Sequence, residues 1–345
     1  MVEINNLRLD VNDIDKEIIR LLIKRKTISD AIISIKKKQC LSVYDKTREL
    51  EIITSLKNQF EGEINPHLIE KVLREILFYS KSDFYKLDSI ITGDLDSVLE
   101  KMPFLIAGPC TIESETQLRD IAGHLNQNGI RLLRGGAFKP RTSPYSFQGL
   151  EDEGLKMMKS IAEMYNMFVV TEFTDSRQLE ELYEFADIIQ IGSRNMFSYG
   201  FLKQIGKKTA LDRKPVLLKR SFNSTINEFL LSAEYIINAG NPNVILCLRG
   251  IRTFEQIDSM MRNTPDLASI LELREHTDLK IVFDPSHACG DAKFVVPTAE
   301  AALKLGADGL IVETHNAPHD AITDGKQSIE PRELERLINY ININY

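Results

Sequence analysis

The chain has 345 residues, which is long for one domain and sufficient for two. Hydrophobic residues make up 43% and charged residues 27%, which indicates a globular protein rather than a disordered or fibrous one. The formal net charge of −7 argues against a nucleic-acid-binding protein, so any anion site must be a local cluster of cations.

The four cysteines are scattered, without a CxxC pair or a disulfide framework. This usage is typical of a reducing compartment. The N-terminal stretch shows no signal-peptide pattern, and no apolar run reaches membrane-spanning length. We therefore expect a cytoplasmic protein that binds neither membranes nor nucleic acid.

A long helix is expected over residues 4–38, where apolar residues recur every three or four positions. A helix of this length exceeds the usual globular range, so it should pack lengthwise on other helices or on a second chain. Two further helices are expected near 46–60 and 66–86, the second opened by a proline. Residues 1–86 thus predict an all-helical domain.

Cations interrupt the apolar pattern of the long helix. Arg25 stands where the periodicity calls for an apolar residue, and Lys36 falls on the same face at about 100° per residue. Long cationic side chains often only extend to solvent from a helix edge, so single positions do not define a site. The pattern LRLDVNDIDKEIIRLLIKR, followed by Lys36 and by VYDKTRE over 43–49, resembles the all-helical chorismate mutase family.

The resemblance covers the expected helical domain and implies a site for chorismate or prephenate. The family's reaction is a pericyclic rearrangement, which needs a folded conformer of the substrate and cations where charge develops, but no nucleophile. The family usually forms an intertwined dimer, which agrees with the long helix, so a homodimer or homotetramer is expected. The implied ligand contacts are Arg8, Arg25, Lys36 and Arg48 for the carboxylates, Asp45 and Glu49 for the ring hydroxyl side, and Ser80 at the pocket wall.

One position departs from the mutase pattern. Four residues after Ser80 the family places a glutamine or glutamate that hydrogen-bonds the breaking ether oxygen, whereas this chain has Phe84. Loss of one such donor costs about 10²–10³ in rate. We therefore expect the helical domain to act as a feedback sensor, a mutase or both, with weak mutase turnover.

The pattern changes at residue 104, after an expected linker over 87–103. Short apolar runs rich in β-branched residues alternate with helical stretches, which favours a (β/α)₈ TIM barrel over residues 104–345. An open doubly wound sheet is the competing fold, but the number of runs favours closure. The runs are 104–110, 131–139, 167–173, 188–194, 215–221, 244–250, 280–287 and 309–315.

In a barrel of this kind the active site lies at the carboxyl ends of the strands. One charged residue at a strand end commonly begins a solvated loop, but here every run ends in a reactive or charged group. We therefore expect an active site at this end of the barrel. The residues are Cys110, Arg134 with Lys139, Glu172, Arg194, Lys219, Arg249, His287 and Glu313, with Asp324 in the loop after the last run.

These residues form two chemical sets. The cations, with Arg141, indicate ligands that carry more than one anionic group, because guanidinium forks bind phosphate and carboxylate oxygens in pairs. The second set mixes thiolate, imidazole and carboxylates, which suits divalent manganese, iron, cobalt or zinc. Its members can meet because strands one, seven and eight are neighbours in a closed barrel. They are Cys110, His287, Glu313 and Asp324.

The loop RGGAFKPRTSPYSF over 134–147 combines cations and hydroxyls on a backbone stiffened by glycine and proline. Together with GPC, QIGSRN, PVLLKR, CLRGIRT, DPSHACG, VETH and ITDG, it resembles the type I 3-deoxy-D-arabino-heptulosonate-7-phosphate (DAHP) synthases. The resemblance covers residues 104–330. The order of the two domains is similar to that of the bifunctional chorismate mutase–DAHP synthases of bacteria.

The DAHP synthase family condenses phosphoenolpyruvate with erythrose 4-phosphate and releases phosphate, the first step of the shikimate pathway to the aromatic amino acids. The resemblance implies a divalent metal that polarises the aldehyde. Mn²⁺ is the ion expected first, and Fe²⁺, Co²⁺ and Zn²⁺ are the alternatives. Lys139, Glu172 and the metal ligand His287 are the implied catalytic residues, with Lys139 and Glu172 in proton transfer and water handling. The implied substrate contacts are Arg134, Lys139, Arg194, Lys219 and Arg249 for phosphoenolpyruvate, and Arg141 and Thr142 for erythrose 4-phosphate.

Two alternatives stay open at this point. The sibling 3-deoxy-manno-octulosonate-8-phosphate synthases use another aldose phosphate, arabinose 5-phosphate, although KPRTS argues against them. A non-catalytic protein that senses chorismate is the other alternative. The complete set of expected metal ligands argues against it for the barrel, but not for the helical domain.

Overall fold

The computed structural model describes the chain except residues 1, 39–45, 83–92, 140–144, 146 and 255–262. The chain divides into two compact units, Met1–Ile91 and Thr92–Tyr345. The expected boundary after residue 86 lies outside the described residues. Among those that are described, every helix is too short or too polar to cross a bilayer.

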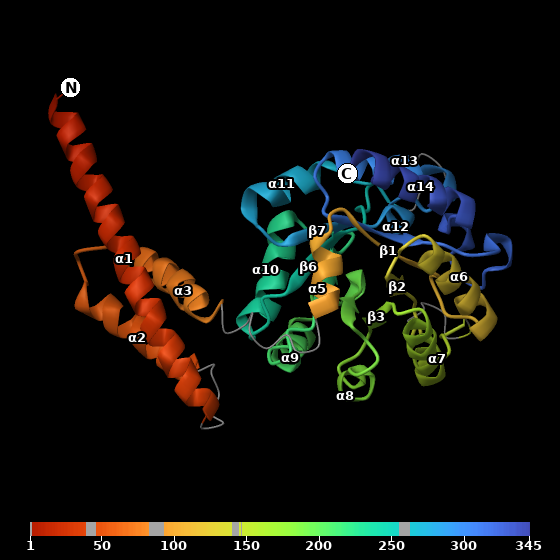
Figure 1. The fold of residues 1–345 in the computed structure, drawn as a ribbon, viewed down its shortest axis with the longest axis horizontal. Coiled ribbons are helices and arrows are strands. Elements are labelled where there is room, and N and C mark those ends of the chain that lie inside the picture. The colour runs from red at the N-terminus through yellow and green to blue at the C-terminus, as the bar shows by residue number, and fades with distance from the viewer. Residues whose placement is uncertain (1, 39–45, 83–92, 140–144, 146, 255–262) are drawn as a thin grey trace. The chain divides into compact units, whose positions relative to one another are not determined.

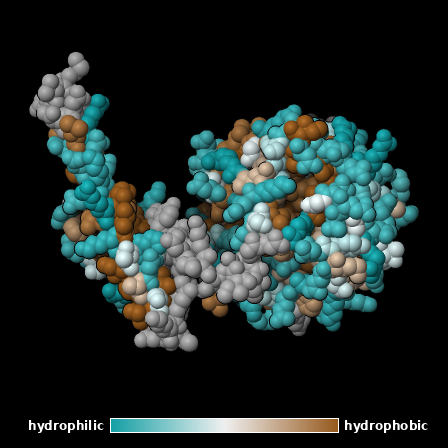
Figure 2. All heavy atoms as spheres, viewed as in Figure 1, coloured by the Kyte–Doolittle hydropathy of each residue, from teal (hydrophilic) through white to brown (hydrophobic). Residues whose placement is uncertain are grey.

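The first unit consists of helices in its described part, α1 (Val2–Lys38), α2 (Lys46–Gln59) and α3 (Pro66–Ser82). The long helix expected from the apolar repeat is confirmed. Both α1 and α2 pack on α3. Most apolar side chains of α1 nevertheless stay exposed in the single chain, and Figure 2 shows hydrophobic side chains on the visible face of this unit.

The second unit is a closed barrel of parallel strands that follow one another in chain order, with β8 pairing back onto β1. The expected barrel is therefore confirmed. The strands are apolar, rich in β-branched residues and buried along almost their whole length, as expected for a sheet covered on both faces. They are β1 (Phe104–Gly108), β2 (Leu132–Arg134), β3 (Phe168–Phe173), β4 (Ile188–Ile191), β5 (Val216–Lys219), β6 (Val244–Leu248), β7 (Lys280–Phe283) and β8 (Gly309–Glu313).

Helices surround this barrel (Figure 1). Several begin at clear sequence signals: Ser114 caps one helix, and Thr225 forms a reciprocal capping box with Glu228 at another. The helices are α6 (Glu115–Gln127), α7 (Glu151–Met164), α8 (Gln178–Leu182), α9 (Tyr199–Lys208), α10 (Ile226–Asn238), α11 (Ala268–His276), α12 (Pro285–Cys289), α13 (Ala292–Lys304) and α14 (Pro331–Asn344), with 3₁₀ turns η1 (Ser193–Asn195), η2 (Pro318–Asp320) and η3 (Gly325–Gln327).

The core has two layers. One lies between the strands and the surrounding helices, and the other fills the barrel with side chains such as Ile106, Val170 and Ile311. Helix α5 (Gly93–Glu100) adds Leu95 and Leu99 to the inner layer. This part of the segment expected as a linker thus packs against the barrel. A filled interior leaves the strand ends as the place where polar groups can gather.

Candidate active site and metal centre

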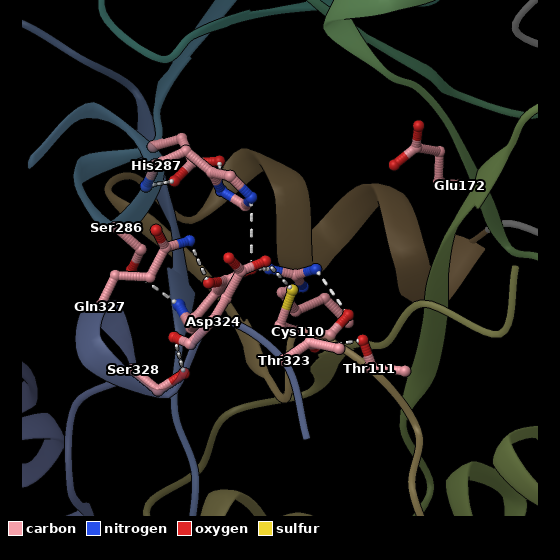
Figure 3. Close-up of polar contacts among 12 residues, drawn as sticks. Cys110, Thr111, Glu172, Ser286, His287, Thr323, Asp324, Gln327 and Ser328 are labelled. Carbon is pink, nitrogen blue, oxygen red and sulfur yellow. Dashed lines mark hydrogen bonds and ion pairs between the residues drawn. The ribbon is translucent and has the colours of Figure 1, made fainter. Parts of the chain in front are cut away.

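Four metal-ligating side chains converge at the carboxyl end of the barrel (Figure 3). Cys110 lies two residues beyond β1, Glu313 ends β8, His287 lies in α12 after β7, and Asp324 begins η3. One ligand atom from each lies within 4.8 Å of the others. Cys110 Sγ is 3.0 Å from Asp324 Oδ2, and His287 Nε2 is 3.4 Å from Glu313 Oε1. The structure therefore brings together the four residues expected to bind metal.

The electrostatics of these groups suit a bound cation. Burial, reinforced by the carboxylates of Glu313 and Asp324, raises the pKa of Cys110 to about 12. Burial would also raise the pKa of Glu313, but His287, Arg134 and Lys139 outweigh it and lower that pKa. One thiol, one imidazole and two carboxylates form a mixed donor set that fits a divalent transition metal. The residues present therefore fit the metal that the sequence implies.

Asp284 fixes the orientation of His287, and sequence reasoning did not assign it a role. Its Oδ2 is 2.8 Å from His287 Nδ1 and accepts from Lys219 Nζ at 2.5 Å, while its Oδ1 accepts from the His287 backbone N–H at 2.9 Å. Burial would raise the pKa of Asp284, but His287 and Lys219 hold it well below its usual range. An ionised carboxylate only accepts, so Nδ1 carries the proton and Nε2 presents its lone pair to the site.

Glu313 is held by three neighbours. Its carboxylate accepts from Arg134 Nη1 at 2.7 Å and from Gln327 Nε2 at 2.5 Å, and its backbone N–H donates to Ser286 Oγ at 3.0 Å. Sequence reasoning missed Gln327 and Ser286 as well. The signals were local: Asp284 and Ser286 belong to DPSH, and Gln327 follows Asp324 by three residues. Without tertiary contacts, nothing in these motifs shows which residue supports which.

Cations surround the metal-ligand group. Arg134 and Lys219 are only 4% exposed, and Arg249 only 8%. Lys139 Nζ lies 3.0 Å from Cys110 Sγ. Arg134 Nε is buried and has no hydrogen-bond partner among the described residues, which leaves a donor for an anionic ligand.

The remaining expected anion contacts are less enclosed or not described. Arg194 lies in η1 after β4 and is exposed, unlike the three buried cations. Arg141 and Thr142 lie outside the described residues. Arg249, by contrast, is one of the three buried cations, and its guanidinium lies 5.8 Å from the ring centroid of Phe222.

Glu172 stands apart from the metal-ligand group in Figure 3. It lies on β3 and accepts a hydrogen bond from Gln190 Nε2 on β4 at 3.1 Å. A Cβ at Gly192 would come within 2.0 Å of Glu172 Oε1. The glycine therefore leaves the space that the carboxylate occupies.

Two of the expected chorismate contacts meet within the helical unit. Arg25 Nη1 donates to Ser80 Oγ, joining α1 to α3, and Ser80 is buried. Burial lowers the pKa of Arg25. The others are not brought together: Arg8 and Arg48 are exposed, Lys36 is half-buried, Asp45 and Phe84 lie outside the described residues, and the side chain of Glu49 in α2 is not described.

Family models match both units. The model of the DAHP synthetase I family matches residues 86–342. The chain belongs to the DAHP synthetase I family. The model of chorismate mutase type II matches residues 7–83, so the chain carries a domain of this type ahead of the synthase barrel.

Similar proteins agree with this assignment. The phospho-2-dehydro-3-deoxyheptonate aldolase of Thermotoga maritima is 44% identical over 274 residues, which is 78% of each chain. Its crystal structure aligns with 46% identity and a TM-score of 0.66, covering 70% of this chain and 68% of that one. A 2-dehydro-3-deoxyphosphooctonate aldolase of Francisella tularensis subsp. holarctica is only 28% identical, over 69% of this chain and 90% of its own. The chain is thus an enzyme of the DAHP synthase family that also carries a domain of the chorismate mutase type.

Proposed function

We propose that the barrel condenses phosphoenolpyruvate with erythrose 4-phosphate to give DAHP and phosphate in the cytoplasm. The observation that carries this proposal is the convergence of four metal-ligating side chains with the buried cations Arg134 and Lys219 at one end of the barrel. Phosphoenolpyruvate carries a carboxylate and a phosphate, and buried cations that bind both offset their charge. The 44% identical aldolase of Thermotoga maritima supports the same substrates.

Different residues of the chain hold the two substrates and the metal. Arg134, Lys219 and Arg249, with Arg194 at the rim, hold the two anionic groups of phosphoenolpyruvate, while Arg141 and Thr142 hold the phosphate of erythrose 4-phosphate. Cys110, His287, Glu313 and Asp324 would hold a divalent metal, preferably Mn²⁺ and otherwise Fe²⁺, Co²⁺ or Zn²⁺. The metal would supply a Lewis acid for the aldehyde.

Proton transfer falls to two groups. Lys139, beside Cys110 Sγ, carries a proton that it can deliver to an oxygen of the substrate. Glu172, which accepts a hydrogen bond from Gln190, accepts a proton from the water that attacks the condensed intermediate. Arg134 also pairs with Glu313, so the phosphoenolpyruvate site and the metal site share a hydrogen bond.

We further propose that the helical domain binds chorismate or prephenate and acts mainly as a feedback sensor of the barrel. The Arg25–Ser80 contact places one expected carboxylate ligand beside the expected pocket wall. Phe84 removes the donor that the rearrangement uses, so mutase turnover is weak. Pairing of two chains through α1 gives a homodimer, or a homotetramer if the barrels also associate.

The test is phosphate release from phosphoenolpyruvate with each aldose phosphate, before and after exhaustive chelation. We expect release with erythrose 4-phosphate, little with arabinose 5-phosphate, loss of activity on chelation, and recovery with Mn²⁺ or Co²⁺. Preference for arabinose 5-phosphate would assign the chain the activity of the distant octulosonate relatives. Full activity in protein shown to be metal-free by elemental analysis would contradict the metal-dependent reaction.

A further inference from the structure

Asp324 differs from the other three expected metal ligands because it lies in a loop rather than at or just after a strand end. Its backbone is in the left-handed region, with φ of 54°, which is uncommon for a residue with a side chain. Its carbonyl accepts from the Gln327 backbone N–H at 3.1 Å and from Ser328 Oγ at 3.3 Å. These bonds fix the backbone after Asp324, so something else must fix the chain before it against the barrel.

A pair of buried threonines supplies this link. Thr111 and Thr323 directly adjoin the metal ligands Cys110 and Asp324 along the chain, and their hydroxyl oxygens lie 2.5 Å apart. The two residues are only 1% and 7% exposed. Thr111 is itself anchored, because it pairs with Gly136 in a parallel bridge next to the strands. Figure 3 shows the two threonines side by side near Cys110 and Asp324.

A second contact ties the same loop to the same segment. The backbone N–H of Ile322 donates to Glu113 Oε1 at 2.8 Å, and His315 Nε2 lies 3.5 Å from Glu113 Oε2. Residues 322 and 323 therefore both attach to the stretch 111–113 that follows β1. The next residue along the loop is Asp324, whose carboxylate reaches Cys110 Sγ.

We propose that the bond between Thr111 and Thr323 is a clasp that positions Cys110 and Asp324 relative to each other and thereby sets the metal affinity of the site. The proposal rests on the proposed function only in taking these two residues as metal ligands. Both threonines are positioning residues, because their hydroxyls bond to each other and would act on the metal only through the neighbouring Cys110 and Asp324. The Glu113 contact restrains the loop as a whole, whereas the clasp acts one residue from each ligand.

The clasp requires a hydroxyl on the side chains of both residue 111 and residue 323. Two facing hydroxyls can approach to 2.5 Å, whereas two carbon atoms need about 3.5–4.0 Å. Valine at either position removes the hydrogen bond and leaves the remaining hydroxyl buried without its partner. Valine at both positions removes the unsatisfied hydroxyl, so stability recovers in part, but it still forces the two segments apart. Serine keeps the hydroxyl and should keep the clasp.

The experiment titrates the metal-free full chain with Mn²⁺ by calorimetry and with Co²⁺ by absorption spectroscopy. We expect Thr111→Val, Thr323→Val and the double variant to bind Mn²⁺ about 10–100-fold more weakly than the parent, with an altered Co²⁺ spectrum. Thr111→Ser and Thr323→Ser should stay within about threefold of the parent, by the same reasoning. Thr323→Ala removes the hydroxyl without added bulk and replaces the valine variants if they fail to fold.

Thr209→Val is the matched control, because Thr209 is fully buried, donates to Ile205 O and accepts from Asn241, far along the chain from the ligands. It should lose stability and keep the Mn²⁺ affinity. Valine or alanine variants that lose only thermal stability, with parental Mn²⁺ affinity and Co²⁺ spectrum, would overturn the clasp and leave the metal site intact. A parent chain that binds neither ion would overturn both the clasp and the metal-dependent function.

Discussion

At position 192 the chain has no room for a side chain, because a Cβ there would lie 2.0 Å from Glu172 Oε1. The backbone itself would accept alanine, since φ is −70° and ψ is 159°. Gly192→Ala should therefore displace the Glu172 carboxylate without unfolding the barrel. If Glu172 acts as a general base, kcat should fall at least about tenfold, toward the 10²–10⁴ that such a base contributes.

The measurement is steady-state phosphate release together with Mn²⁺ titration, which should show unchanged metal affinity. Gly200→Ala is the control, because a Cβ at Gly200 meets open space at the start of α9. A Gly192→Ala enzyme with the parental kcat would show that the position of Glu172 is immaterial to turnover.

Asp284 joins the group of expected metal ligands to a buried cation, because one carboxylate contacts both His287 and Lys219. Asp284→Asn keeps the shape but removes the charge that balances a buried lysine, and it replaces one of the two accepting oxygens by an NH₂ group that only donates. We expect Mn²⁺ affinity to fall about 10–100-fold and the KM for phosphoenolpyruvate to rise. Calorimetry and initial-rate kinetics measure the two effects.

Asp308→Asn separates this effect from general destabilisation. Asp308 precedes β8 and accepts from Arg274 and from the Ile281 backbone N–H, so it also pairs with a cation and a backbone donor, but at the amino end of the barrel. That variant should lower the free energy of unfolding and leave the metal affinity unchanged. Equal loss of metal affinity in both variants would mean that Asp284 acts only through stability.

Among the described helices and strands, α1 leaves the most large apolar side chains exposed. Its apolar side chains Ile14, Ile18, Ile28 and Ile32 are each about half exposed in the single chain, and covering one such side chain fully is worth about 1.5–3 kcal/mol. If a second α1 covers this face, Ile18→Lys should shift the protein toward monomers and raise the dissociation constant at least tenfold, about 1.4 kcal/mol. Light scattering over a concentration series measures the change.

Asn12→Lys adds the same charge to α1 at an exposed position about 120° from Ile18 around the helix. It should leave the assembly intact. Dissociation by both variants would point to net charge rather than to the apolar face as the determinant.

The elements themselves were predictable because each depends on local pattern. Apolar, β-branched runs such as VILCL gave the strands, and the spacing of Ile14, Ile18 and Ile28 gave α1. Cys110, His287 and Glu313 were predictable as a group because closure makes β7, β8 and β1 neighbours. What could not be predicted depends on contacts between distant segments.

The Thr111–Thr323 bond spans 212 positions, and the Lys219–Asp284 pair spans 65. No periodicity links such residues, so only the folded chain shows their partners. Arg194 lies in the 3₁₀ turn that follows β4 and is exposed. Sequence reasoning thus named the expected ligand groups and missed Asp284 and Thr323, whose partners lie far along the chain.

At the scale of the whole molecule, the chain joins a domain of the chorismate mutase type to a synthase barrel, so a ligand of one domain can regulate the other. A ligand of the helical domain can affect the barrel only if its affinity differs between two arrangements of the chain, and typical coupling is about 1–3 kcal/mol. We expect the inhibitor of the barrel to be a later product of the pathway that begins with the barrel's reaction. Arg25, which donates to Ser80, is one of the expected carboxylate ligands, and the structure brings it together with a second expected contact.

We therefore expect prephenate or chorismate to inhibit DAHP synthesis by the full chain, with slow mutase turnover. Full-length Arg25→Ala should keep the condensation rate and weaken inhibition about 5–150-fold, the range that corresponds to this coupling, and a chain of residues 87–345 should lose inhibition altogether. Phe84→Gln should raise mutase turnover, because glutamine restores a donor to the breaking ether bond. Initial rates of phosphate release and of chorismate loss measure both activities. A shortened chain that prephenate still inhibits would place the regulatory site in the barrel, and rapid chorismate turnover by the parent would make the helical domain a second enzyme.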